Sequence, residues 1–171
     1  MKRILAVLAL LAVAVGAFAA TATTTQIVDI TISEVVAIAV NPAGNIALGT
    51  VIPTAGDPVG GDSDASTYLQ YTVATSAACW ISARLNAAMP AGTELHLVAV
   101  IGSAGGGGSQ GTATAERTLT TSDQTIITAI ANCYTGSAAT EGANVTYSLV
   151  ITGGPAPVVT SRTVTLTLTD T

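Results

Sequence analysis

Charged residues are scarce in this sequence, and basic residues are the scarcest. Only 9% of the 171 residues are charged, while 49% are apolar. An ordinary soluble domain is about one quarter charged. Lys2 and Arg3 lie at the start, and the only later basic residues are Arg84, Arg117 and Arg162. Because phosphate binding requires clusters of lysine and arginine, nucleic acid is excluded as a partner and an anionic membrane surface is disfavoured.

A chain so poor in charge must cover much of its surface with Thr, Ser, Ala and Gly. Disordered chains combine low hydrophobicity with high charge, and this sequence has the opposite balance, so we expect it to fold. Beyond the first three residues, three arginines stand against ten acids, which gives a net charge of −7. Since a surface with little charge resists association only weakly, the composition indicates a protein that assembles.

Residues that commonly carry catalysis are also few. His96 is the only histidine, no Gly-x-Ser-x-Gly motif accompanies it, and no lysine follows Lys2. The lack of a Gly-x-Ser-x-Gly motif beside the single histidine argues against a hydrolase triad. The lack of lysine excludes Schiff-base chemistry on a lysine of the later chain. We expect His96 to be a surface or interface residue and the protein not to be an enzyme.

Cysteine occurs only twice, at Cys79 and Cys133. Each shares a strand face with apolar neighbours, so we expect both to lie in the core. In an exported chain such a pair predicts one intramolecular disulfide, because disulfides persist outside the cytosol. The bond would close a loop of about 55 residues and stabilise the fold by about 4 kcal/mol in the chain-entropy description. A metal site is the alternative, but a single histidine leaves it short of ligands.

The first residues have the features of a signal peptide. Two basic residues precede a short apolar run at 4–15, and Ala17-Phe18-Ala19 offers a small-x-small cleavage site. We therefore expect residues 1–19 to be removed, with residue 22 as a second possible end. The run is short for a membrane span, so an uncleaved anchor is the weaker alternative. The mature protein is expected to be extracellular and free of the membrane.

Short alternating runs rich in Val, Ile, Thr and Tyr fill most of the later chain. Gly, Pro, Asn and Asp separate these runs, and no later segment has convincing helical periodicity. Such regular spacing is typical of an all-β sandwich, either immunoglobulin-like or jelly-roll. We expect one such domain over residues 35–171. The nine expected strands lie at 23–40, 45–53, 67–76, 79–86, 93–101, 112–121, 124–133, 144–152 and 160–171.

One acidic, glycine-rich loop is a candidate metal site. The stretch GDPVGGDSD contains Asp57, Asp62 and Asp64, and calcium prefers such hard oxygen ligands. The spacing lacks the glycine and the closing glutamate of an EF-hand loop. Solvated turn residues are therefore the simpler interpretation, and calcium is the only cofactor that the sequence suggests.

Two further surface features are weaker signals. Asn144-Val145-Thr146 is an N-glycosylation sequon, which has meaning only in a cell with the required machinery. Trp80 and the four tyrosines could form a sugar-binding platform, although such residues more often serve packing or interfaces.

The segment 23–40, TTTQIVDITISEVVAIAV, is longer than most strands of globular domains. Val28, Ile30 and Ile32 alternate with polar residues, and a break at Ser33-Glu34 separates them from a second alternating run. An unpaired apolar edge is a liability for a monomer. A subunit that lends this strand to a neighbouring sheet resolves the conflict. We expect residues 23–34 to be such a donor-strand extension.

Taken together, these features resemble secreted donor-strand β-sandwich fibre subunits. The features are the signal peptide, the alternating N-terminal segment, the paired cysteines and the terminal TVTLTLTD. The group includes archaeal bundling-pilus and thread proteins, matrix fibres of the TasA kind and chaperone–usher-like pilins, and no motif selects one of them. Cannula-type tube proteins are a neighbouring possibility if the acidic loop binds calcium.

This resemblance implies a structural subunit of an extracellular, cell-surface fibre or pilus, such as those of biofilms. The subunit would polymerise head-to-tail with copies of itself, and Val28, Ile30 and Ile32 would enter the next subunit. The alternative is a monomeric secreted binding module, such as a sugar-binding adhesin. In that case the N-terminal strand would pair within its own domain.

Overall fold

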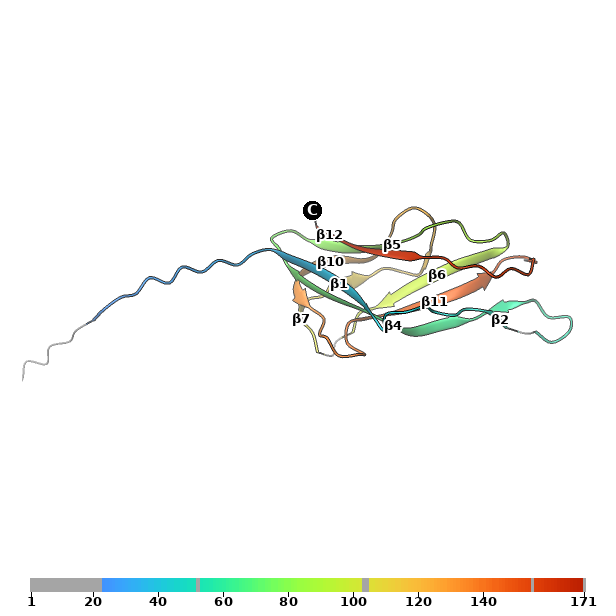
Figure 1. Ribbon diagram of the computed structural model, residues 1–171, viewed down its shortest axis with the longest axis horizontal. Coiled ribbons are helices and arrows are strands. Elements are labelled where there is room, and N and C mark those ends of the chain that lie inside the picture. Colours follow the sequence, from blue (N-terminus) through green and yellow to red (C-terminus); the bar gives the residue numbers. More distant parts are fainter. Residues whose placement is uncertain (1–22, 52, 103–104, 155, 171) are drawn as a thin grey trace, which may run out of the picture. The chain divides into compact units, whose positions relative to one another are not determined.

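The computed structural model describes residues 23–51, 53–102, 105–154 and 156–170 (Figure 1). The chain divides into two units, Met1–Ile32 and Ser33–Thr171. The predicted signal peptide, with either of its ends, lies outside the described residues. Within the part that is described, no helix is both long enough and apolar enough to cross a membrane.

In the described part of the second unit every helix-or-strand element is a strand, which confirms the all-β prediction. Alternation of apolar and polar residues explains this, because a strand presents successive side chains to opposite faces. The strands are β1 (Val35–Asn41), β2 (Thr50–Val51), β3 (Gly60–Gly61), β4 (Ser63–Ala74), β5 (Cys79–Leu85), β6 (Thr93–Val100), β7 (Gly107–Ser109), β8 (Thr112–Ala113), β9 (Arg117–Thr118), β10 (Gln124–Tyr134), β11 (Ala143–Ile151) and β12 (Val164–Asp170).

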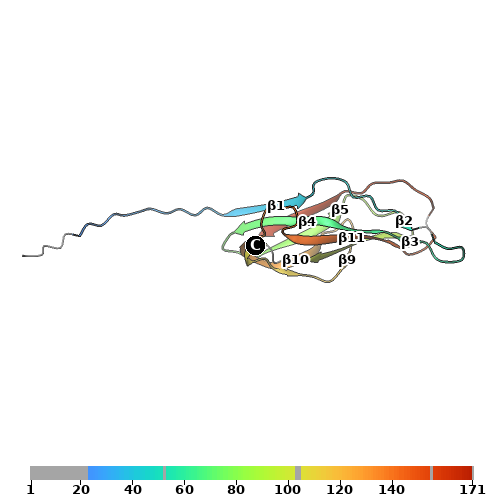
Figure 2. The same ribbon diagram turned by 90° about the horizontal axis from the view of Figure 1, so that it is seen from below.

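Ten of these strands form one continuous antiparallel sheet, in the order β12-β5-β10-β4-β11-β6-β9, with β1, β7 and β8 attached to its sides. β10 joins two parts of this sheet, because its residues 124–130 pair with β5 and its residues 133–134 pair with β4. Bulges and the positive φ of Ala129 (55°) interrupt the part of β10 that pairs with β5, and a further register shift lies between Ala131 and Cys133. The arrangement is consistent with a β-sandwich, and Figure 2 shows it from a second direction.

The core lies between the β4-β11-β6 part and the β5-β10 part of the sheet. Alternate residues of β4, β6 and β11 enter it, as the sequence pattern predicts, while β5 and β10 also bury adjacent residues. The fully covered side chains include Leu69 of β4, Ile81 of β5 and Val145 of β11, each 0% exposed. Larger apolar side chains of the core also come from Leu85, Leu95, Leu97, Leu119, Ile126, Ile127 and Ile130.

The predicted disulfide is wrong for this structure, in which Cys79 and Cys133 are free and buried. Both do lie in the core, as their apolar neighbours suggested. In the strand register the two cysteines do not stand opposite each other. Ile130 stands opposite Cys79, while Cys133 lies three positions further along β10, opposite Val73 and Gly108. Burial raises the pKa of both thiols.

Three expected strands are much shorter than predicted. In the segment 112–121 only β8 and β9, two residues each, are strand. In the segment 23–40 only β1 is a strand, and residues 23–34 have no regular structure. In the segment 45–53 only the two residues of β2 pair, with Gly60 and Gly61 of β3. The last two segments carry apolar side chains that remain exposed, such as Ile30, Ile46 and Val51. Alternation marks which residues favour a strand, but a strand also needs a partner for its main chain.

Candidate functional site

β1 and β12 are edge strands that lie next to each other. β1 pairs with β4 along one side, and β12 pairs with β5 along one side. Within the described residues, the other edge of each strand has no partner strand. We call the boundary between β1 and β12 the seam (Figure 1). Edges of this kind present main-chain donors and acceptors that can pair with an added strand.

The seam covers its part of the core incompletely. Val36, Ile38 and Val40 of β1 stand opposite Val73, Tyr71 and Leu69, so they belong to the core face. Val73, Tyr71 and Leu69 are 2%, 3% and 0% exposed, whereas Val36 and Val40 are 41% and 39% exposed. The inward-facing side chains of the seam therefore remain partly open to solvent, unlike their neighbours one strand further in.

The inward-facing side chains of β12 are also only partly covered. Val164, Leu166 and Leu168 stand opposite the buried Leu85, Ala83 and Ile81. All three pack against the core but are only partly buried. Six apolar residues of two adjacent edge strands thus face inward without full cover. A further strand that brought its own apolar side chains would complete this region.

An apolar groove of about 1380 Å³ opens at one end of the seam. Its walls include Val40 of β1, Leu95 of β6, Tyr147 and Leu149 of β11, and Val164 and Leu166 of β12. The chain segments 43–50 and 156–163 contribute most of the rim. Apart from Thr50 of β2, these segments have no regular structure. The expected strand at 45–53 is thus replaced largely by the rim of this groove.

The groove and the start of the second unit lie at opposite ends of β1. β1 begins with Val35 opposite Ala74 and ends with Asn41 opposite Tyr68. The groove borders Val40 and the residues that follow β1, and so lies at the Tyr68 end. The chain enters the unit at the Ala74 end. There Glu34 Oε1 accepts hydrogen bonds from Thr75 Oγ1 at 3.2 Å and from Ser76 Oγ at 3.5 Å.

The predicted polymerisation residues lie in the first unit. Residues 23–32 have no regular structure. Val28, Ile30 and Ile32 are 70%, 79% and 86% exposed, and Ile27 is 88% exposed. A ten-residue segment that exposes four large apolar side chains is unusual on the surface of a monomeric soluble protein. The sequence alone identified this segment, but not the groove, because the groove comes from strands distant in the chain.

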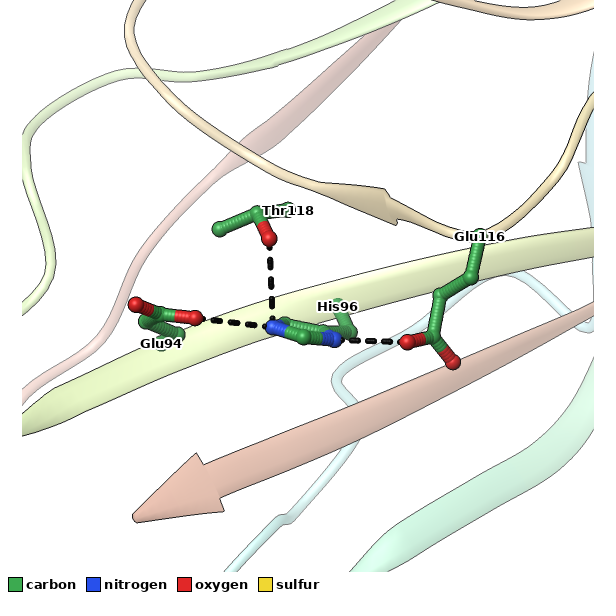
Figure 3. Close-up of polar contacts among 4 residues, drawn as sticks. All are labelled: Glu94, His96, Glu116 and Thr118. Atoms are coloured by element: carbon green, nitrogen blue, oxygen red, sulfur yellow. Dashed lines mark hydrogen bonds and ion pairs between the residues drawn. The ribbon is translucent and has the colours of Figure 1, made fainter. Parts of the chain in front are cut away.

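His96 belongs to a polar cluster on β6 and β9, far along the sheet order from β12 (Figure 3). Its Nε2 lies 2.9 Å from Glu94 Oε2, and its Nδ1 lies 2.7 Å from Glu116 Oε1. Thr118 Oγ1 lies 3.2 Å from Nε2. Hydrogen bonds with Glu94 and then Glu116 raise the pKa of His96. Both ring nitrogens are engaged by carboxylates, which favours the imidazolium and leaves no free nitrogen for a general base.

The three acids of the candidate calcium loop are not brought together. Across the described ranges, no group of three or more His, Cys, Asp or Glu side chains is placed to hold a metal ion. Asp62 Oδ1 accepts from the Ser63 N–H at 2.8 Å. Asp64 Oδ1 accepts from both the N–H and the hydroxyl of Ser66, at 2.9 and 2.6 Å. Asp57 lies in a turn, where its N–H donates to the Thr54 carbonyl at 3.0 Å.

Asn144 and the aromatic residues occupy positions that the sequence did not define. Asn144 lies in β11, and its Nδ2, the atom that would carry a glycan, donates to the carbonyls of Ala65 and Thr67 at 2.8 and 3.3 Å. Two of the four tyrosines, Tyr71 and Tyr147, are buried in the core, where they contribute nothing to a surface platform with Trp80. Burial raises the pKa of Tyr147 to about 12.

Comparisons with protein-family models, with curated proteins and with solved structures found no match.

Proposed function

We propose that this protein is a structural, non-enzymatic subunit of an extracellular fibre that polymerises head-to-tail. Residues 23–32 of one copy would enter the groove of the next copy and continue along the seam between β1 and β12. The observation that carries the proposal is the match between the seam and the N-terminal segment. The seam leaves inward-facing apolar residues partly uncovered, and the N-terminal segment carries exposed apolar residues at alternate positions.

The geometry of the second unit supports a repeating contact. The chain enters at one end of β1, and the groove opens at the other end. A segment that precedes Ser33 of one copy can therefore reach the groove of another copy stacked end to end. Such a contact joins two different surfaces, so it propagates into a filament instead of closing as a dimer.

Direction and energetics follow from the same arrangement. The incoming segment ends at the groove mouth, where its own domain begins, so it runs antiparallel to β12. Its main chain would pair with the free edge of β12, and Val28, Ile30 and Ile32 would point into the core. Burial of three such side chains contributes about 5–8 kcal/mol before the cost of ordering the segment is subtracted.

The test is a pair of aspartate substitutions at neighbouring positions. Ile30→Asp should abolish assembly, because it places an unpaired charge among apolar side chains. Thr31→Asp adds the same charge on the opposite, outward face of the strand and should leave filaments largely intact. Sedimentation and negative-stain microscopy of the native material measure both. If the Ile30→Asp protein still forms filaments, the donor segment is assigned wrongly.

The alternative function, a monomeric binding module, predicts a different result. In that case wild-type protein sediments as a single chain, and neither substitution changes its mass.

A further inference from the structure

The groove and the N-terminal segment each contain a single charged side chain. Among the described residues that line the groove, Arg162 is the only charged one. Asp29 is the only residue with an ionisable side chain within residues 23–32. One of the three basic residues of the later chain therefore lines an apolar groove.

Arg162 is held in place by main-chain acceptors. Its Nε donates to the Ala88 carbonyl at 2.8 Å, and its Nη1 donates to the Ser161 carbonyl at 3.0 Å and to Thr160 Oγ1. Among the described residues, no carboxylate lies within ion-pair distance of its guanidinium. Arg84, by contrast, lies 3.8 Å from Asp123. Arg162 is therefore a positioned cation without an acidic partner in the described part of its own chain.

The position of Arg162 suits an acid in an incoming strand. It lies two residues before Val164, at the end of β12 that borders the groove. An incoming segment antiparallel to β12 would pass this point with its C-terminal half, which contains Asp29. Because Asp29 alternates with Val28 and Ile30, its carboxylate would stay at the solvent side of the strand, within reach of a long side chain at the rim.

We propose that Arg162 recognises Asp29 of the incoming segment and thereby fixes the register of the donated strand; this inference rests on the fibre function proposed above. Alternation alone rejects a slip of one residue, because that slip turns the apolar side chains outward. A slip of two residues keeps them inward and shifts the strand by about 6.6 Å. An ion pair between Arg162 and Asp29 would disfavour the two-residue shift, because the shift would separate the two charges.

Charge reversal in the full-length mature protein tests this role. Filament elongation would be followed by light scattering at low salt, with seeds of the same variant. Arg162→Asp and Asp29→Arg should each slow elongation at least two- to fivefold, the effect of about one rim ion pair. The double variant should recover most of the wild-type rate. Arg162→Lys keeps the charge and should elongate faster than Arg162→Gln. The effects should shrink at about 0.5 M salt, where exposed charges are screened.

Two controls separate the possible failures. Arg84→Gln removes a basic side chain that does not line the groove, and it should leave the elongation rate unchanged. If both single reversals elongate like wild type while Ile30→Asp abolishes assembly, the donor segment stands and the role of Arg162 is overturned. If the single variants are slow and the double variant is not restored, Arg162 acts without Asp29, which also overturns the pairing. If Ile30→Asp assembles normally, the proposed function itself has failed.

Discussion

At the scale of single residues, His96 is the centre of a polar cluster that joins two neighbouring strands. Its imidazole links Glu94 of its own strand to Glu116, which precedes β9 (Figure 3). The side chain of His96 is 18% exposed, and those of the two glutamates are 43% and 53% exposed. The pair of contacts holds the short strand β9 against β6.

The cluster predicts a stability that depends on pH. Because the folded pKa of His96 is raised, its contribution is fully present below the unfolded value of about 6.5. The contribution is lost as pH rises through the folded pKa. His96→Gln should therefore lower the free energy of unfolding by about 1 kcal/mol near pH 5 and by much less near pH 9. Urea unfolding at both pH values measures this.

A neighbouring substitution provides the control. Ser148 stands opposite His96 in the β6–β11 pairing, and Ser148→Ala should change the stability equally at both pH values. An equal loss for His96→Gln at pH 5 and pH 9 would show that the imidazolium contributes nothing beyond packing.

At the scale of elements, the β11–β4 pairing depends on one glycine. Gly142 precedes β11 with φ of +109°, and a Cβ at this position would overlap the Leu69 carbonyl oxygen. Gly142→Ala should lower the free energy of unfolding by about 2–4 kcal/mol, because it adds both backbone strain and overlap with a central strand. Denaturant unfolding followed by Trp80 fluorescence measures the change.

Gly49→Ala is the matched control. A methyl group added at Gly49 would meet no atom within 4 Å, and the backbone there has no positive φ. The replacement should therefore change stability by less than about 0.5 kcal/mol. Equal effects of the two substitutions would contradict the close packing of β11 on β4.

Elements also mark the limit of sequence interpretation here. Alternation predicted β4, β5, β6, β10, β11 and β12. These predictions were correct because each of these strands has a partner strand within the same domain. Alternation overestimated 45–53, where Ile46 and Leu48 border the groove instead of pairing. It also placed Cys79 and Cys133 together on the core side, but it could not supply the register that puts Ile130 opposite Cys79. Periodicity reports which face a residue favours, whereas pairing depends on contacts distant in the chain.

The candidate site likewise has one part that the sequence could predict and one part that it could not. Val28, Ile30 and Ile32 were identifiable from local alternation at the start of the chain. The groove was not, because it joins β1, β6, β11 and β12 through tertiary packing. Arg162 was visible only as one of three late arginines, and its place at the groove mouth required the fold.

At the scale of the whole molecule, low charge and an incomplete seam have the same consequence. Few charges oppose contact between copies. Beyond the first three residues the net charge is −7, from ten acids and three arginines that are spread along the chain. The groove lies at the opposite end of β1 from the entry of the chain, so each added copy would present a new groove. In the proposed fibre, each copy would supply the strand that completes the seam of its neighbour.

The most direct test is a high-resolution electron cryomicroscopy structure of the native material. The proposal predicts filaments in which an added strand lies along the free edge of β12, with Val28, Ile30 and Ile32 directed into the core. That strand should be continuous with β1 of the next subunit. Dispersed single chains, or filaments in which the seam between β1 and β12 holds no added strand, would contradict it.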